Sequence, residues 1–144
     1  MNIVYYKDTD SNAVPVKQFL SKYLNSLHDT NKQKEHKVKM MAKINEVFSI
    51  AANNNGIVGG QFSEPLKNCK FQAFRISDGD ILNRIFYFCY YREKIVLLNA
   101  FEKPDSYDKG LKKKVEKEYI KSLEQTNIYY NKFIRNPKKY EKYK

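Results

Sequence analysis

Three strand-like runs follow one another in the middle of the chain, and their close spacing limits the folds open to it. The runs span residues 71–76, 81–91 and 95–101 and are rich in β-branched and aromatic residues, which favour extended structure. They are joined only by the turn sequences SDGD and REK, which are too short for a helical crossover. The segment therefore predicts an antiparallel meander.

Each of these runs carries a cation or ends beside one. Arg75, Arg84 and Lys103 lie among Phe, Tyr, Ile, Val and Leu, where a charge must reach solvent or a partner. Strand alternation places Arg75 on the face of Phe71, and Arg84 on the face of Phe86. Whether these two faces coincide depends on a strand register that the sequence does not fix.

Two interpretations of these cations are open from the sequence. In one they form an anion site, and for a chain this basic the expected anion is a nucleic-acid phosphate. In the other, Arg75 and Arg84 form surface ion pairs with Asp78 or Asp80, and Lys103 is a solvated lysine at the end of a strand.

Helical periodicity on both sides of the meander completes the expected fold. A short strand at residues 3–6 precedes an apolar stripe over residues 16–27, and a second stripe covers residues 35–52. A basic helix is predicted from Leu111 onward. We therefore expect an α/β fold of the α+β kind, with two N-terminal helices packed on a small antiparallel sheet and a basic C-terminal helix.

The size and charge of the chain restrict its organisation and its partners. Its 144 residues fit one domain, expected over residues 1–126, followed by a basic and partly disordered extension over residues 127–144. The formal net charge is +11, and from residue 109 onward twelve Lys or Arg stand against four Glu. Such a field attracts polyanions, including RNA, DNA and acidic proteins.

The remaining residue classes predict neither a metal nor a membrane span. Cys69 and Cys89 are the only cysteines and lack CxxC spacing, so we expect free thiols, no metal and no cofactor. His28 and His36 are expected on helix surfaces. No apolar run approaches the roughly 18 residues of a membrane span, and the polar start MNIVYYKDTD predicts no signal peptide. A cytoplasmic location is expected.

Four motifs in a fixed order resemble a known family. They are PLKN, FQAFRIS, NRIFYF and IVLLNAFEKP. This set resembles the RelE and HigB superfamily, the toxins of type II toxin–antitoxin systems, and in particular its phage-derived, HigB-like branch. The positions that match are Leu66, Lys67, Arg75, Arg84, Phe101 and Lys103. The chain departs from the pattern at Asn99, where a histidine is usual, and at Pro104, where many relatives carry a second lysine.

The resemblance implies a RelE/ParE-like fold and an endoribonuclease that cuts messenger RNA on the ribosome and is silenced by an antitoxin. The chemistry is attack of a ribose 2′-hydroxyl on the adjacent phosphate, for which arginine and lysine can stabilise the developing charge without a metal. The catalytic residues it implies are Arg75, Arg84, Lys103 and Tyr107. The residues expected to bind RNA are Lys67, Lys70, Lys112, Lys113 and Lys114.

Two other functions fit the same residues. The chain could be a non-catalytic nucleic-acid-binding module, which the substitution at Pro104 would permit. It could also be a ParE-like toxin that targets gyrase, in which the RNA site is vestigial. Since one fold can host all three functions, the site must decide among them.

Overall fold

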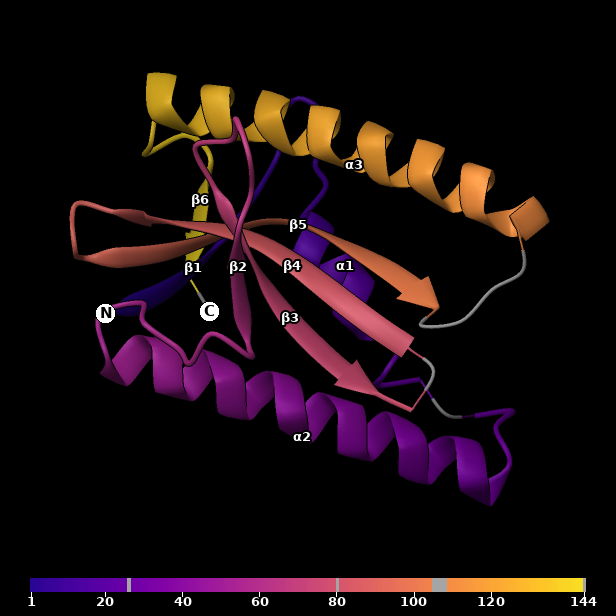
Figure 1. The fold of residues 1–144 in the computed structure, drawn as a ribbon. Coiled ribbons are helices and arrows are strands. Elements are labelled where there is room, and N and C mark those ends of the chain that lie inside the picture. Colours follow the sequence, from indigo (N-terminus) through magenta and orange to yellow (C-terminus); the bar gives the residue numbers. More distant parts are fainter. Residues whose placement is uncertain (26, 80, 105–108, 144) are drawn as a thin grey trace.

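Two long helices cover opposite faces of a central β-sheet. The computed structural model describes residues 1–25, 27–79, 81–104 and 109–143. Helix α2 (Asn31–Asn53) lies on one face and helix α3 (Lys109–Arg135) on the other (Figure 1). The short helix α1 (Pro15–Ser21) packs into the same apolar cluster as α2. The chain is therefore of the α+β class, with layers in the order helix, sheet, helix.

Within the described residues the sheet has six strands and is mixed. In chain order they are β1 (Asn2–Tyr6), β2 (Ser63–Pro65), β3 (Gln72–Asp78), β4 (Ile81–Tyr90), β5 (Lys94–Pro104) and β6 (Glu141–Tyr143). Their order across the sheet is β2-β3-β4-β5-β1-β6. Strands β3, β4 and β5 form the antiparallel meander that the sequence predicts. Strand β1 runs parallel to β5, while β2 and β6 pair antiparallel at the two edges.

The expected RelE/ParE-like arrangement, two N-terminal helices on a small antiparallel sheet, is wrong. The sheet is larger and mixed, because β1 adds in parallel to β5 and the three-residue strands β2 and β6 extend both edges. Such short strands carry too little periodicity to be predicted from sequence. Only α2 is a long N-terminal helix. Helix α1 has seven residues, and Leu24 and Leu27, expected in its buried stripe, are 72% and 79% exposed.

Helix α2 begins and ends at clear local signals. The Thr30 side chain accepts a hydrogen bond from the Gln33 N–H, and the Gln33 side chain accepts one from the Thr30 N–H, which is a capping box. After the helix, Asn55 and Gly56 adopt positive φ values of 56° and 81°, conformations that end helices. The second predicted helix is thus confirmed, although Val38 of its expected buried face is exposed.

Apolar side chains form one core on each face of the sheet. On the α2 side, the Phe74 and Tyr87 rings stack with centroids 3.7 Å apart, and both rings are buried. On the α3 side, Phe86 and Phe88 pack in one cluster with Phe133 of the helix. The two cores together fix both helices on the sheet, since buried aromatic rings contribute large apolar areas.

The C-terminal segment returns to the beginning of the chain. Phe133 and Tyr140 are buried in the α3-side core, and β6 pairs with β1. The expected domain boundary at residue 126 falls inside α3, and Thr126 itself is fully buried. None of the described helices is both long enough and apolar enough to cross a membrane.

Candidate active site

Arg75 and Arg84 lie directly opposite each other on neighbouring strands. The register of β3 and β4 pairs the two residues, so their side chains share one face of the sheet. That face carries Phe86 and Phe88 and is the one covered by α3. The register left open by the sequence thus brings the two predicted catalytic arginines together. Like charges facing each other are destabilising unless an anion lies between them.

The anion in this structure is the Glu64 carboxylate of β2. Arg84 donates from Nε to Glu64 Oε1 at 2.7 Å, and Arg75 Nε lies 3.7 Å from Glu64 Oε2. Glu64 pairs with Ala73 across the β2–β3 ladder, which places it on the arginine face. Pro65 is the last residue of β2, as suits a residue that has no N–H to continue a ladder.

Sequence reasoning missed Glu64. It assigned the arginines either to a free anion site or to ion pairs with Asp78 or Asp80. Asp78 instead turns toward α2, where its carboxylate lies 3.1 Å from Lys43 Nζ and 3.2 Å from His36 Nδ1, and Asp80 lies outside the described residues. The only signal for Glu64 was its position next to the PLKN motif.

The Tyr119 ring of α3 covers Arg84. The guanidinium carbon of Arg84 is 4.9 Å from the centre of the ring, a cation–π contact. The ring also packs against Phe86 and Phe101, which anchor it over the sheet. Burial raises the pKa of the Tyr119 hydroxyl, the Arg84 charge opposes this, and the Glu64 charge adds to it. The hydroxyl therefore keeps its proton throughout the neutral range.

The cluster of Glu64, Arg75, Arg84 and Tyr119, called the arginine cluster below, has more positive than negative charge. Two guanidinium groups face one carboxylate. The Arg84 side chain is 13% exposed and is held by Glu64, whereas the Arg75 side chain is 42% exposed. Arg75 Nε is buried and makes no hydrogen bond to another described residue. Because its side chain is the more exposed of the two, Arg75 is the arginine that an incoming anion can reach.

Of the other predicted catalytic residues, Lys103 lies near the end of β5. Lys103 pairs with Leu82 and comes two residues after Phe101, whose ring faces α3, so Lys103 shares the arginine face. Tyr107 lies outside the described residues. The described part of the predicted catalytic set is thus gathered on one face, beneath the N-terminal half of α3.

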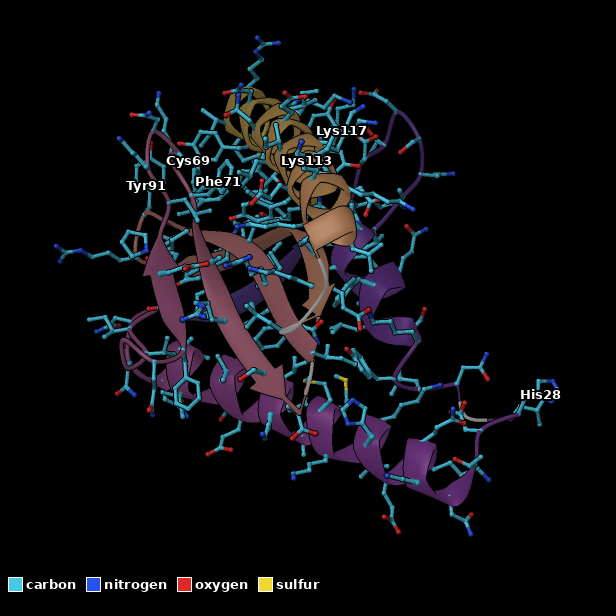
Figure 2. All side chains as sticks on the ribbon, turned by 45° about the vertical axis from the view of Figure 1, so that its right-hand side comes forward. His28, Cys69, Phe71, Tyr91, Lys113 and Lys117 are labelled. Carbon is cyan, nitrogen blue, oxygen red and sulfur yellow. The ribbon has the colours of Figure 1, made fainter. Side chains whose placement is uncertain are left out.

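The predicted RNA-binding lysines are more widely spread. Lys67 and Lys70 are exposed in the loop between β2 and β3, and Lys70 borders a groove at the edge of the sheet. Lys112, Lys113 and Lys114 are exposed near the start of α3, where Lys113 projects from the outer surface (Figure 2). These lysines lie outside the arginine cluster.

The chain was also compared with known proteins. No family model, curated protein or solved structure matches it.

Proposed function

We propose that the chain is a metal-independent endoribonuclease and that the arginine cluster is its active site. One observation carries the proposal: two arginines stand opposite each other on one sheet face with a carboxylate between them. Guanidinium groups match the geometry of a phosphodiester and stay charged at all relevant pH values. A carboxylate beside them can act as a general base.

In the proposed reaction Glu64 accepts the proton of a ribose 2′-hydroxyl. The 2′ oxygen then forms a bond to the adjacent phosphorus, and the bond from phosphorus to the 5′ oxygen breaks. Arg75 and Arg84 stabilise the charge that develops on the phosphoryl oxygens. The departing 5′ oxygen takes a proton, for which the Tyr119 hydroxyl and the Lys103 ammonium are the candidates on this face. The products are a cyclic phosphate and a free 5′-hydroxyl.

The charge of the chain supports an RNA substrate. A net charge of +11, together with the exposed cations Lys67, Lys70 and Lys112–Lys114, would concentrate a polyanion near the cluster. The motif resemblance extends the proposal to messenger RNA, bound in the cytoplasm and on the ribosome, and to a toxin held inactive by an antitoxin protein. These partners rest on the motifs alone.

One observation favours a second function, binding of RNA without cleavage. Glu64 already holds Arg84, whose side chain is only 13% exposed, so the cluster resembles a partly buried structural ion pair. In that case the exposed lysines would bind RNA, and affinity would fall steeply with salt concentration without any cleavage product.

Brief induction of the chain in bacteria, followed by sequencing of transcript ends, tests the proposal. Wild type should arrest growth and create new 5′ ends, and Arg84→Ala should abolish both. Arg135→Ala removes the same charge from an exposed position near the end of α3 and serves as the matched control. New transcript ends that persist in Arg84→Ala would overturn the proposed site. DNA damage with intact transcripts would indicate gyrase as the target.

A further inference from the structure

A groove of about 440 Å³ lies at the edge of the sheet, between the β2–β3 loop and α3. The groove exists because β4 extends beyond β3 and β2 at this end of the sheet. Strand β3 begins at Gln72, which pairs with Tyr87 of β4 and with Pro65, the last residue of β2. Phe88 and Cys89 of β4 lie beyond these pairs. Tyr130 of α3 lines the groove from above the sheet. The edge of β4 is thus left open to a ligand in this region.

The inner wall of the groove is aromatic and rigid. The Phe88 and Tyr130 rings meet edge to face with centroids 4.8 Å apart, and Phe71 lies 6.4 Å from Tyr130. Phe71 and Phe88 are only 4% and 7% exposed, while Tyr130 is half-buried. Of these three rings, the half-buried Tyr130 is the one that leaves surface on which a planar ring can stack, and base stacking on an aromatic side chain contributes about 1 to 3 kcal/mol per base.

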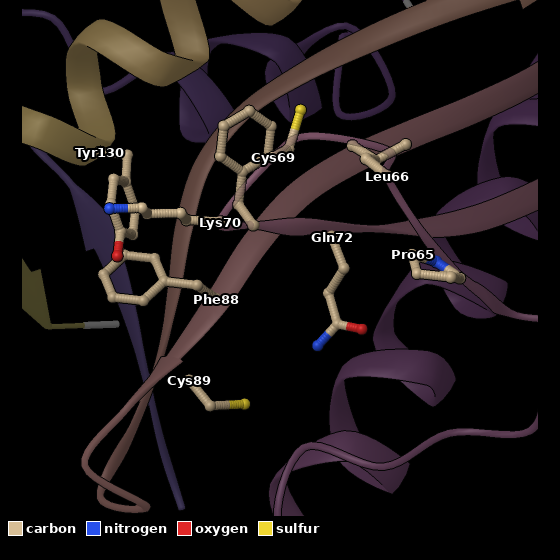
Figure 3. A pocket seen from close by; sticks show the side chains of 9 residues that line it. Pro65, Leu66, Cys69, Lys70, Gln72, Phe88, Cys89 and Tyr130 are labelled. Atoms are coloured by element: carbon tan, nitrogen blue, oxygen red, sulfur yellow. The ribbon is translucent and has the colours of Figure 1, made fainter.

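The polar groups at the groove suit a base that carries a phosphate. Lys70 supplies an exposed ammonium, and the Gln72 amide supplies both a donor and an acceptor for the edge of a base. Figure 3 shows Lys70 beside Phe88 and Tyr130, with Gln72 and Cys89 further down the groove. None of the described residues that line the groove is acidic. An anionic ligand with a flat aromatic part therefore fits better than a cationic one.

We propose that this groove binds one base of a single-stranded RNA and sets the sequence preference of the chain. The inference rests on the proposed function, because it assumes that RNA lies at the arginine cluster. The groove and that cluster share the α3-facing side of the sheet: Phe88 of the groove lies four residues after Arg84 on β4, and strand alternation points both side chains to that side. At about 3.3 Å per residue the two places are roughly 13 Å apart, within reach of nearby nucleotides of one strand.

Alkylation of the two cysteines can measure whether RNA occupies the groove, without any cleavage of the RNA. Cys69 and Cys89 both line the groove, and burial raises the pKa of each thiol, so alkylation is measured at alkaline pH. The probe is a short single-stranded RNA with 2′-O-methyl riboses, which cannot be cut. At about ten times its Kd, alkylation of the exposed Cys89 should slow about tenfold.

Matched variants distinguish RNA binding in this groove from a general attraction of RNA to the positive charge of the chain. Lys70→Ala and Gln72→Ala should each weaken the protection of Cys89 and reduce the difference in affinity among the four homopolymers. Lys138→Ala removes one exposed lysine elsewhere and should change neither. Unchanged alkylation of Cys89 while the RNA is bound and cut would overturn the groove and leave the active site standing. Protection without Arg84-dependent cleavage would support the groove and refute the nuclease.

Discussion

Two clusters of opposite charges, one beside each half of α3, differ in their balance of charge. In the arginine cluster one carboxylate, Glu64, lies between two guanidinium groups. At the other end of α3, two carboxylates share one ammonium: Lys132 Nζ lies 3.0 Å from Asp8 and 2.9 Å from Asp10. We call this second set the lysine clasp. It joins α3 to the loop that follows β1.

The two clusters differ in how completely their polar atoms are satisfied. Asp8 is 5% exposed, and both carboxylate oxygens accept hydrogen bonds, from the Tyr6 hydroxyl, the Ser11 hydroxyl and Lys132. By contrast, Arg75 Nε makes no hydrogen bond to another described residue, and the side chain is partly open to solvent. A cluster whose polar atoms are all hydrogen-bonded, such as the one around Asp8, stabilises the fold. A cluster with more donors than acceptors, such as the arginine cluster, can bind a negatively charged ligand.

Changes at Arg84 should have a large effect on cleavage. Removal of one oriented donor to a developing oxyanion typically costs about 10²–10³ in rate, so Arg84→Ala should lose about this much. Arg84→Lys should recover little, because an ammonium cannot bond to Glu64 and phosphate as a planar fork does. Cleavage of a short RNA by purified protein measures both. Full activity of Arg84→Lys would indicate that charge alone suffices.

The lysine clasp should affect stability and leave cleavage unchanged. Asp8→Asn removes the buried charge and one acceptor site, and should lower the free energy of unfolding by about 2 kcal/mol. Urea denaturation measures the change. Asp10→Asn, at an exposed position in the same clasp, is the control and should shift the midpoint much less. A loss of cleavage per folded molecule in Asp8→Asn would mean that the two clusters are coupled.

A smaller effect on cleavage is expected from Tyr119. Tyr119→Ala removes the ring that holds Arg84, and a cation–π contact of about 1 to 2 kcal/mol corresponds to a loss of roughly five- to thirtyfold. Tyr119→Phe keeps the ring that contacts Arg84 and removes the hydroxyl, so it distinguishes positioning of Arg84 from proton donation. Near-normal cleavage in Tyr119→Phe would show that the tyrosine only positions Arg84, whereas a loss equal to that of Tyr119→Ala would show that its hydroxyl donates a proton.

The smallest effect is a dependence of stability on pH that comes from the clasp. Burial opposes ionisation of Asp8, but hydrogen bonds from Ser11, Lys132 and Tyr6 prevail and lower its pKa below the ordinary value of 3.8. The stabilisation is therefore complete at neutral pH and is lost as the pH falls below about 4. Urea titrations from neutral to acidic pH should show this loss in wild type and a flatter curve in Asp8→Asn. If the stability of wild type and of Asp8→Asn fell in parallel with pH, Asp8 would be excluded as the source of the pH dependence.

The sequence predicted the parts of the site that depend on local pattern. Short turns predicted the meander, and alternation predicted the faces of Arg75 and Arg84. The common register followed only from the structure, because it depends on strand pairing and not on either strand alone.

The partners of the arginines could not be predicted, because they come from distant parts of the chain. Glu64 precedes Arg84 by twenty residues and sits on a strand too short to show alternation. Tyr119 reaches Arg84 through the packing of α3 on the sheet, and the angle of such packing is not encoded in helical periodicity. Parallel pairing of β1 with β5 is likewise a long-range contact, and missing it made the predicted sheet too small.

The most direct test of the arginine cluster is a paired measurement of RNA binding and RNA cleavage for Glu64→Gln. The change keeps the shape of the side chain and removes its charge. If Glu64 is the general base, cleavage should fall by about 10²–10⁴, while RNA affinity stays the same or increases as the net positive charge rises. Metal chelation should change neither value in wild type. Undiminished cleavage in Glu64→Gln would contradict the proposed mechanism.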